Sequence, residues 1–510
     1  MNSKTLRCGL LITFICLLPS VAAADALRLP AIFGNHMVLQ RDQPIPVWGW
    51  SDPGAEVTVS FRDQRVTTIT RADGQWTATL AAESTGESAD LIVLSGDDLV
   101  FTDVLVGDVW VASGQSNMSW TVSNSNNAEA EIEAADHPDI RLFTLKRRVS
   151  TEPLREAGGS WVACTPEATK GFSAVAYFFG RELQEELDVP IGLINTSWGG
   201  TPAEAWTSIG ALAANPELTS IIEQRTRDIV NYPEKLSVHI GELAAWAARR
   251  VTAESDGAEF TERKPRGPRG PEHPHLPAGL YNGMIQPLIP YGIRGVIWYQ
   301  GESNGSRPEQ YATLFPTMIR DWRRQWGQGA FPFLFVQLAN FMPNGDESGR
   351  VWAFLREAQT QTLRLPNTGM AVTIDIGNPD DIHPRNKQDV GKRLALAAQA
   401  VAYDQSVIAS GPMFSELTID GSEAVISFSN AETGLTGVKG KVLGFEIAGK
   451  DRIWVPATAT ISGAKVLVSN PVIPEPVAVR YAWANSPEAT LANGVNLPAV
   501  PFRTDDWSRE

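Results

Sequence analysis

A serine in a tight turn is the first residue of this sequence with the chemistry to attack an ester. Ser116 lies in residues 114–118 (GQSNM), directly after an apolar stretch. A serine on a strand-to-helix turn is exposed, and the backbone N–H groups around it can stabilise an oxyanion. We interpret Ser116 as a candidate nucleophile, although a Gly-x-Ser string after a strand is more often only a turn.

His383 is the candidate base for that serine. It lies in residues 380–384 (DDIHP), and Asp380 precedes it by three residues. A carboxylate at this spacing can hydrogen-bond the second ring nitrogen and orient the imidazole. The other five histidines fall in a β-rich segment, in helical stretches or in a proline-rich insertion: His36, His137, His239, His273 and His275.

Two more polar segments follow predicted strands. Residues 298–304 (WYQGESN) carry side chains that can donate hydrogen bonds to a developing oxyanion. Residues 196–206 (TSWGGTPAEAW) contain adjacent glycines, which let a backbone N–H approach a substrate closely. These segments predict a site of acyl transfer around the serine.

Ser303 is a competing nucleophile. Residues 301–305 (GESNG) form a G-x-S-x-G string between a predicted strand and a predicted helix, as in the nucleophile elbow of an α/β-hydrolase. In that fold the acid and base normally come from separate loops, whereas Asp380 and His383 share one loop. We therefore rank Ser303 below Ser116.

The elements that must position these residues alternate between strands and helices. Apolar runs predict strands at 104–112, 191–195, 295–299, 333–337 and 370–374. Helical patterns between them cover 174–187, 310–325, 353–363 and 389–402. This alternation predicts a parallel α/β sheet, in which ligands bind at the carboxyl ends of the strands.

A chain of 510 residues exceeds one hydrophobic core, and both of its ends are predicted to be β-rich. Residues 25–103 and 411–510 show short alternating runs with turn signals, which indicate sandwich-like segments. Whether they form one module or two stays open. Between them we expect a hydrolase domain at 104–410. An insertion at about 225–278, helical and then rich in Arg, Pro and Gly, is interpreted as a long solvated loop.

The first 24 residues have the pattern of a secretory signal peptide. Lys4 and Arg7 precede an apolar run at 9–18, and alanines ending at Ala24 offer a cleavage site. The run is too short to span a bilayer. We expect cleavage after Ala24 and a periplasmic or secreted protein.

The remaining chain has the composition of an acidic globular protein. Its only cysteine is Cys164, so no internal disulfide is expected. The net charge of −15 becomes −17 once the peptide is removed, which disfavours nucleic acid and anionic membranes. We expect no metal or other cofactor, because no ligand cluster has convincing spacing. The oligomeric state stays open.

The blocks GQSNM, WYQGESN and DDIHP, in this order, resemble the SGNH (GDSL-like) hydrolases, specifically the sialate O-acetylesterase and carbohydrate acetylesterase group. Further similar segments extend the resemblance over most of the chain: 280–285 (LYNGMI), 356–359 (REAQ), 445–449 (FEIAG) and 501–505 (PFRTD). The resemblance implies an α/β fold, an SGNH-type three-layer αβα sandwich with a mostly parallel sheet, flanked by the β-sandwich-like segments. It also implies a carbohydrate O-acetylesterase.

The resemblance implies catalytic roles residue by residue. Ser116 matches the nucleophile, His383 the base, and Asp380 the acid of a D-x-x-H block, with Asp381 as its rival. The reaction would be a two-step acyl transfer, in which the serine takes the acetyl group and water then releases it.

The oxyanion would be held by the N–H of the nucleophile, by a backbone N–H around Gly199 and by a polar side chain of the WYQGESN block (298–304). We expect that side chain to be Gln300, with Asn304 second. Glu302 cannot donate while ionised, so we expect it to order the site. Gln115 is grouped with these oxyanion and substrate residues.

The expected partner is an acetylated oligo- or polysaccharide. Four tryptophans lie within or beside the blocks, and we expect one or two of them to touch substrate and the others to be packing residues: Trp120, Trp198, Trp206 and Trp298. Arg385 is a candidate partner for the carboxylate of sialic acid. The negative net charge instead favours a neutral plant polysaccharide such as xylan or xyloglucan.

The sequence disfavours two other classes of function. A carbohydrate-binding protein with an inactive hydrolase domain is disfavoured by the intact set of Ser116, Asp380 and His383. A lipid esterase is disfavoured because no long apolar lid segment is present.

Overall fold

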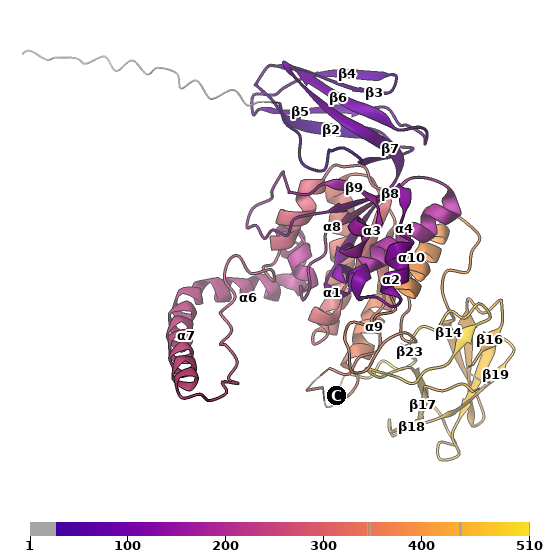
Figure 1. The fold of residues 1–510 in the computed structure, drawn as a ribbon. Helices are drawn as coiled ribbons and strands as arrows, with labels where there is room; N and C mark the ends of the chain where they lie inside the picture. The colour runs from indigo at the N-terminus through magenta and orange to yellow at the C-terminus, as the bar shows by residue number, and fades with distance from the viewer. Residues whose placement is uncertain (1–26, 344, 347, 438–440, 509–510) are drawn as a thin grey trace, which may run out of the picture.

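The computed structural model describes residues 27–508 except 344, 347 and 438–440 (Figure 1). The predicted signal peptide at 1–24 lies outside the described residues. Among the described helices, none combines the length and the apolar character needed to cross a membrane. Cys164 is buried and free.

A mostly parallel sheet forms the centre of the molecule. Its strand order is β13-β12-β11-β7-β10-β8-β9, and only β9 runs antiparallel to its neighbour. The bounds are β7 Asp97–Gly114, β8 His137–Thr144, β9 Trp161–Cys164, β10 Ile191–Asn195, β11 Gly295–Tyr299, β12 Phe333–Val336 and β13 Thr368–Ala371. Side chains on both faces of the inner strands are buried, which explains their continuous apolar sequences.

Helices cover both faces of this sheet. On one face α10 (Lys387–Ala402) packs against α4 (Ala174–Leu187), β12 and β13. On the other face Phe315 of α8 (Pro308–Trp326) contacts Phe335 of β12, and α9 (Val351–Thr362) packs against α8. The predicted three-layer αβα arrangement is therefore confirmed.

Short helical turns link these elements. They are α1 Ser116–Ser119, η1 Val122–Asn124, α2 Ala128–Glu133, α3 Pro166–Lys170, η2 Ala203–Trp206, α5 Ile209–Ala213, η3 Pro216–Leu218, η4 Tyr281–Ile285, η5 Gln286–Leu288 and η6 Glu302–Asn304. Two of them, α1 and η6, begin within two or three residues of the ends of β7 and β11. They occupy the edge of the sheet at which ligands bind in such folds.

The long strand β7 joins the N-terminal β-rich segment to the central sheet. Its first seven residues are exposed or partly exposed, and its last eleven are all buried. The predicted boundary at 103/104 therefore marks a change of environment within one strand rather than a break in the chain. The other strands of this segment are β1 Val38–Gln40, β2 Ile45–Trp50, β3 Glu56–Phe61, β4 Gln64–Ile69, β5 Gln75–Leu80 and β6 Ala89–Ser95.

The C-terminal β-rich segment lies at the opposite end of the central α/β part from the N-terminal one, so the two are separate (Figure 1). It contains two four-stranded sheets, of order β14-β15-β20-β19 and β18-β17-β21-β23. The bounds are β14 Met413–Asp420, β15 Glu423–Ser429, β16 Leu435–Thr436, β17 Phe445–Ala448, β18 Trp454–Pro456, β19 Thr458–Ser462, β20 Lys465–Ser469, β21 Ala478–Tyr481, β22 Ala492–Asn493 and β23 Phe502–Arg503.

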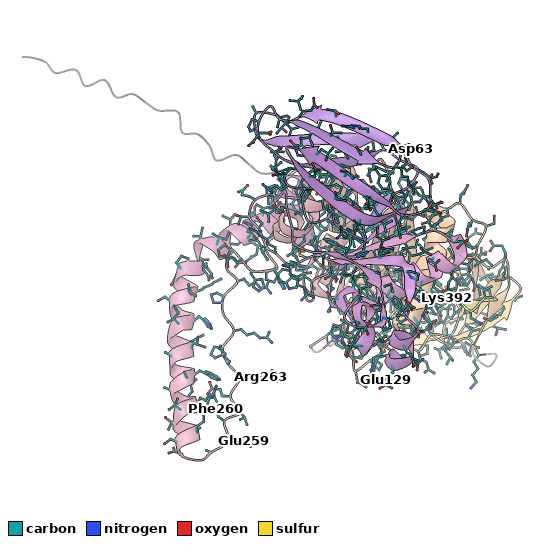
Figure 2. The ribbon with its side chains drawn as sticks, turned by 45° about the horizontal axis from the view of Figure 1, so that its top comes forward. Asp63, Glu129, Glu259, Phe260, Arg263 and Lys392 are labelled. Carbon is teal, nitrogen blue, oxygen red and sulfur yellow. The ribbon has the colours of Figure 1, made fainter. Side chains whose placement is uncertain are left out.

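The insertion is more ordered than the expected solvated loop. It contains α6 (Thr219–Val230) and α7 (Tyr232–Ser255), and α7 extends away from the body of the protein (Figures 1 and 2). The chain then returns along α7, where Phe260 contacts the Trp246 ring and Glu262 pairs with Arg249 at 2.6 Å. No residue of α7 is buried, which explains why its sequence pattern is that of a solvated segment.

Candidate active site

Ser116 lies at the junction of β7 and α1, as its sequence context predicted. Gly114 ends the strand with a φ of 134°, and a Cβ atom there would lie 2.2 Å from the carbonyl oxygen of Tyr299. Only glycine fits so close to the neighbouring strand. The chain therefore turns sharply, and Ser116 is left partly exposed at the first residue of α1.

The loop after β10 meets this turn from the adjacent strand. The Trp198 N–H donates to the Gly114 carbonyl at 3.0 Å. A Cβ atom placed on Gly199 would lie 3.3 Å from Cβ of Ser116. Gly199 therefore lies close to the serine, and a side chain at this position would crowd it.

His383 approaches the same turn from the loop before α10. Its ring stacks on Trp120 with centroids 5.0 Å apart and planes 13° apart. The amide of Asn117 also donates to the Ile382 carbonyl at 2.9 Å. Two residues that follow Ser116, Asn117 and Trp120, therefore contact the histidine loop. No direct Ser116–His383 hydrogen bond is formed among the described residues.

The surroundings of His383 favour its neutral form. Burial lowers the pKa of His383 below its usual 6.5, the charge of Lys387 lowers it further, and Asp381 opposes them. A neutral imidazole has a free lone pair, so it can accept a proton at neutral pH.

The carboxylate beside His383 belongs to Asp381 rather than Asp380. Asp381 Oδ1 lies 3.9 Å from Nδ1 of His383 and accepts the His383 backbone N–H at 2.9 Å. Asp380 is exposed, and its N–H donates to Oδ1 of Asn378 at 2.9 Å. Within the described residues nothing joins Asp380 to His383. The turn that begins at Asn378 directs Asp380 to solvent, so its assignment from the D-x-x-H spacing does not fit this geometry.

Three polar side chains next to the serine turn, Asn117, Glu302 and Lys387, are joined by hydrogen bonds. Asn117 donates to Oε1 of Glu302 at 2.6 Å and accepts from Nζ of Lys387 at 2.6 Å. Burial raises the pKa of Glu302 and lowers that of Lys387 to about 7. Oε2 of Glu302 is buried without a hydrogen-bond partner among the described residues. This arrangement fits the ordering role expected of Glu302.

Asn117 and Lys387 were missed by sequence reasoning. The available signal was their position, since Asn117 directly follows the serine and Lys387 begins a helix four residues after His383. A lysine is seldom fully buried, so the residue type alone suggested a surface position.

The amide side chains of the WYQGESN block, expected to donate to the oxyanion, form hydrogen bonds within the protein instead. Gln300 is fully buried and donates to Asn304 Oδ1 at 2.7 Å and to the Thr201 carbonyl at 3.3 Å. Asn304 donates to Glu204 at 2.9 Å. These amides tie the β11 loop to the loop after β10, so the expectation that either one faces the oxyanion is not supported.

Gln115 and Ser303 form a contact with each other. The Ser303 N–H donates to Oε1 of Gln115 at 3.2 Å. No hydrogen bond links Ser303 to a histidine in the described part of the chain. Ser303 therefore lies beside the Ser116 turn and has no histidine partner among the described residues.

The four tryptophans divide evenly between surface and core. Trp206 and Trp298 are fully buried, with ring centroids 6.0 Å apart. Trp120 and Trp198 are partly exposed beside the serine turn. Arg385 is exposed and donates to the Asn124 carbonyl at 3.0 Å, which places it at the rim of the same loops.

No group of three or more His, Cys, Asp or Glu side chains in the described ranges is arranged to hold a metal ion. The residues gathered here are a serine, a histidine and an aspartate with backbone N–H groups nearby. Their chemistry is that of acyl transfer.

Known proteins with similar sequences fit this chemistry. Residues 106–231 and 277–400 match a family described as "Carbohydrate esterase, sialic acid-specific acetylesterase". The sialate O-acetylesterase of Mus musculus is 31% identical over 95% of both chains, and that of Homo sapiens is 30% identical over 94% of this chain and 93% of the other.

A solved structure is also similar. A carbohydrate acetylesterase from Xanthomonas citri is 41% identical, with a TM-score of 0.81, and the match covers 94% of this chain and 100% of that one. The structural likeness extends through both β-rich segments. The family match, by contrast, omits residues 232–276, which contain α7 and the segment that returns along it.

Proposed function

Because this chain belongs to the sialic acid-specific acetylesterase family of carbohydrate esterases, we propose that it removes O-acetyl groups from sugars with Ser116 as nucleophile, His383 as general base and Asp381 as the orienting acid. The acetylesterase activity follows from the family and from the relatives. The residue assignments are our proposal and rest on the contacts at the strand ends.

The proposed reaction has two steps. His383 accepts the Ser116 hydroxyl proton as Oγ attacks the acetyl carbonyl carbon, and the N–H groups of Ser116 and Gly199 stabilise the oxyanion. The C–O bond to the sugar breaks, and His383 gives the proton to the departing sugar oxygen. Water then attacks the acetyl-serine as His383 takes one of its protons. The bond between the acetyl carbon and Ser116 Oγ breaks, His383 returns the proton to Oγ, and acetate leaves.

The observation that carries this proposal is the docking of the histidine loop on the serine turn. Asn117 donates to the Ile382 carbonyl, and Trp120 stacks on His383. Catalytic hydrogen bonds in ligand-free enzymes often tighten only when substrate binds. We therefore expect the Ser116–His383 hydrogen bond to form when the sugar ester binds.

The direct test is acetate release from acetylated sialic acid and acetylated xylan by Ser116→Ala and by the matched variant Ser303→Ala. We expect activity to disappear only in Ser116→Ala. The opposite pattern would assign the reaction to the G-x-S-x-G string. Acetate release by neither the wild type nor Ser303→Ala would favour a carbohydrate-binding protein.

We also propose that the protein is exported, to the periplasm or out of the cell. The basic start, the apolar run at 9–18 and the alanines ending at Ala24 support this. Expression of the full-length sequence in a bacterium should yield a protein whose first residue is Asp25. Retention of residues 1–24 in the cytoplasmic fraction would contradict export.

A further inference from the structure

Helix α7 and the segment that returns along it form an arm, residues 232–276, that carries a run of cations. Residues 263–271 (RKPRGPRGP), termed the basic strip, contain four basic residues and no acidic one, although the whole chain has a net charge of −15. All four of these side chains are exposed, and among the described residues no carboxylate pairs with them. Glu262, the acid next to the strip, is paired with Arg249 at 2.6 Å. The charges of the strip are therefore available to a ligand.

The glycines of the strip pack on α7. A Cβ atom on Gly267 would lie 3.3 Å from Nε2 of His239, and one on Gly270 would lie 2.7 Å from the Tyr232 ring. These glycines are three residues apart, whereas the helix residues that they meet are seven apart. Seven residues of an α-helix rise about 10.5 Å, and three residues of a polyproline II chain rise about 9.3 Å. The agreement indicates that the strip runs along α7 in the extended conformation that its prolines favour.

The arginines of the strip follow the same spacing as its glycines. Arg263, Arg266 and Arg269 are each three residues apart. A polyproline II chain has three residues per turn, so residues three apart lie on the same edge, about 9 Å from one another. The glycines occupy the edge that meets α7, and the exposed arginines therefore form a row along a different edge.

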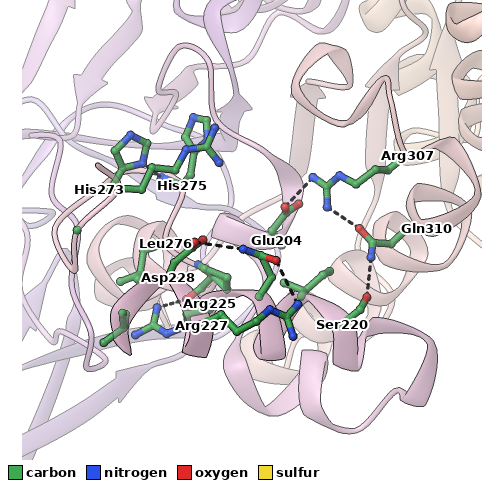
Figure 3. Close-up of a pocket in the computed structure, with 16 residues that line it drawn as sticks. Glu204, Ser220, Arg225, Arg227, Asp228, His273, His275, Leu276, Arg307 and Gln310 are labelled. Carbon is green, nitrogen blue, oxygen red and sulfur yellow. Dashed lines mark hydrogen bonds and ion pairs between the residues drawn. The ribbon is translucent and has the colours of Figure 1, made fainter. Parts of the chain in front are cut away.

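Contacts hold the returning segment at both of its ends. Near the far end of the arm, Phe260 packs on Trp246 with ring centroids 5.6 Å apart (Figure 2). At the base of the arm, Arg225 of α6 donates to the Pro277 carbonyl at 3.3 Å, and Arg269 lines a pocket of about 320 Å³ (Figure 3). The row is thus held in place before any ligand arrives, which reduces the entropy lost on binding.

The arm also separates these cations from the acidic body of the protein. Helix α7 has 24 residues and is therefore about 36 Å long, and it extends away from the body (Figure 1). At physiological ionic strength the field of a charge is screened over about 8 Å. A polyanion bound along the arm is therefore shielded from most of the repulsion by the body.

We propose that the basic strip is a polysaccharide-binding site, separate from the serine turn, that pairs its arginine row with the carboxylates of a uronic acid polymer. Guanidinium groups suit this ligand because their planar donors pair with both oxygens of a carboxylate. Evenly spaced cations suit a linear polymer whose charges repeat, whereas a small anion would meet only one of them. The site anchors the enzyme on acidic polysaccharide and does not depend on which serine reacts.

Two observations favour a polysaccharide over nucleic acid as the polymer. The strip has no aromatic residue on which a base could stack. The chain also belongs to a family of carbohydrate esterases, although the family match omits the arm. The strip therefore adds a binding site to the part of the chain that defines the family.

The test measures binding of the whole protein to polygalacturonate by isothermal titration calorimetry. Methyl-esterified polygalacturonate is the matched ligand, because it has the same backbone without the charge. We expect about tenfold tighter binding to the free acid than to the ester. Raising the salt concentration should weaken binding to the free acid, because the pairs are exposed to solvent.

The row is tested by the triple variant Arg263→Gln/Arg266→Gln/Arg269→Gln, which should bind polygalacturonate about tenfold more weakly than the wild type. Both it and its control should hydrolyse 4-nitrophenyl acetate at the wild-type rate, which shows that each is folded.

The control is Arg65→Gln/Arg364→Gln/Lys392→Gln, which removes the same charge from exposed positions outside the arm. It should keep the wild-type affinity for polygalacturonate. Equal losses of affinity in the two triple variants would overturn the proposal, because net charge alone would then govern binding.

Two further results would overturn the proposal. One is equal affinity for polygalacturonate and its methyl ester. The other is tighter binding to phosphatidylglycerol vesicles than to polygalacturonate, which would make the arm a lipid-binding element. Neither result bears on the assignment of Ser116, which is tested separately by acetate release.

Discussion

The ammonium group of Lys387 donates to Oδ1 of Asn117 at 2.6 Å, directly behind the proposed nucleophile Ser116. The same asparagine donates to Glu302 and to the Ile382 carbonyl. One buried side chain therefore connects the serine turn, the β11 loop and the histidine loop. The network fixes the spacing of groups that belong to three separate strand ends.

We predict that Lys387→Met lowers kcat by about tenfold or more and changes KM little, because small displacements of reacting groups are costly. The measurement is steady-state hydrolysis of 4-nitrophenyl acetate. Lys392→Met is a control on the same helix, since Lys392 is exposed. Equal losses in the two variants would argue against a positioning role for Lys387.

The orienting acid is tested by two neighbouring substitutions. Asp381→Asn should lower kcat by roughly 10²- to 10⁴-fold, because the His383 ring loses its carboxylate partner. Asp380→Asn should stay within about twofold of the wild type, because Asp380 is exposed and has no contact with the ring. A larger loss in Asp380→Asn would restore the D-x-x-H assignment.

The pH profile reports the protonation of His383. Only the neutral ring can accept a proton, so activity is lost as pH falls through its pKa, which burial lowers below 6.5. The acidic limb of kcat/KM should lie below pH 6.5. Removing the Lys387 charge should move the limb to higher pH, and removing the Asp381 charge should move it to lower pH. Shifts in the same direction would contradict these charge effects.

The backbone of Gly199 is tested by adding one methyl group. Gly199→Ala places a Cβ atom 3.3 Å from Cβ of Ser116, so Ser116 and the Gly199 loop must move slightly apart. We expect kcat to fall by about tenfold to a hundredfold. Gly210→Ala, where the new atom meets nothing within 4 Å, should leave kcat unchanged. Undiminished kcat in Gly199→Ala would remove this N–H from the oxyanion site.

The central sheet was largely predictable from sequence because its inner strands are buried on both faces. The predicted strands at 191–195 and 295–299 coincide with β10 and β11. The first half of β7 was not predicted as part of the same strand. Its alternating exposure is that of a sheet with one solvated face, and burial rather than hydrogen bonding produces the sequence pattern.

The sequence predicted which loops at the strand ends form the site. It did not predict which side chains on those loops contact each other. Ser116, Gly199 and His383 lie on loops that meet, as the α/β rule for ligand sites implies. Which aspartate lies beside His383 depends on the turn at Asn378, and the D-x-x-H spacing does not encode it. Likewise, the sequence shows that Gln300 is an amide but not that its hydrogen bonds lie within the protein.

The most direct test of the account is to identify the serine that reacts with a fluorophosphonate, which labels only an activated serine hydroxyl. Peptide mass spectrometry of the labelled wild type should find the modification on Ser116, and His383→Ala should abolish labelling. Modification of Ser303, or continued labelling of Ser116 in His383→Ala, would contradict the assignment of Ser116 and His383 as nucleophile and base.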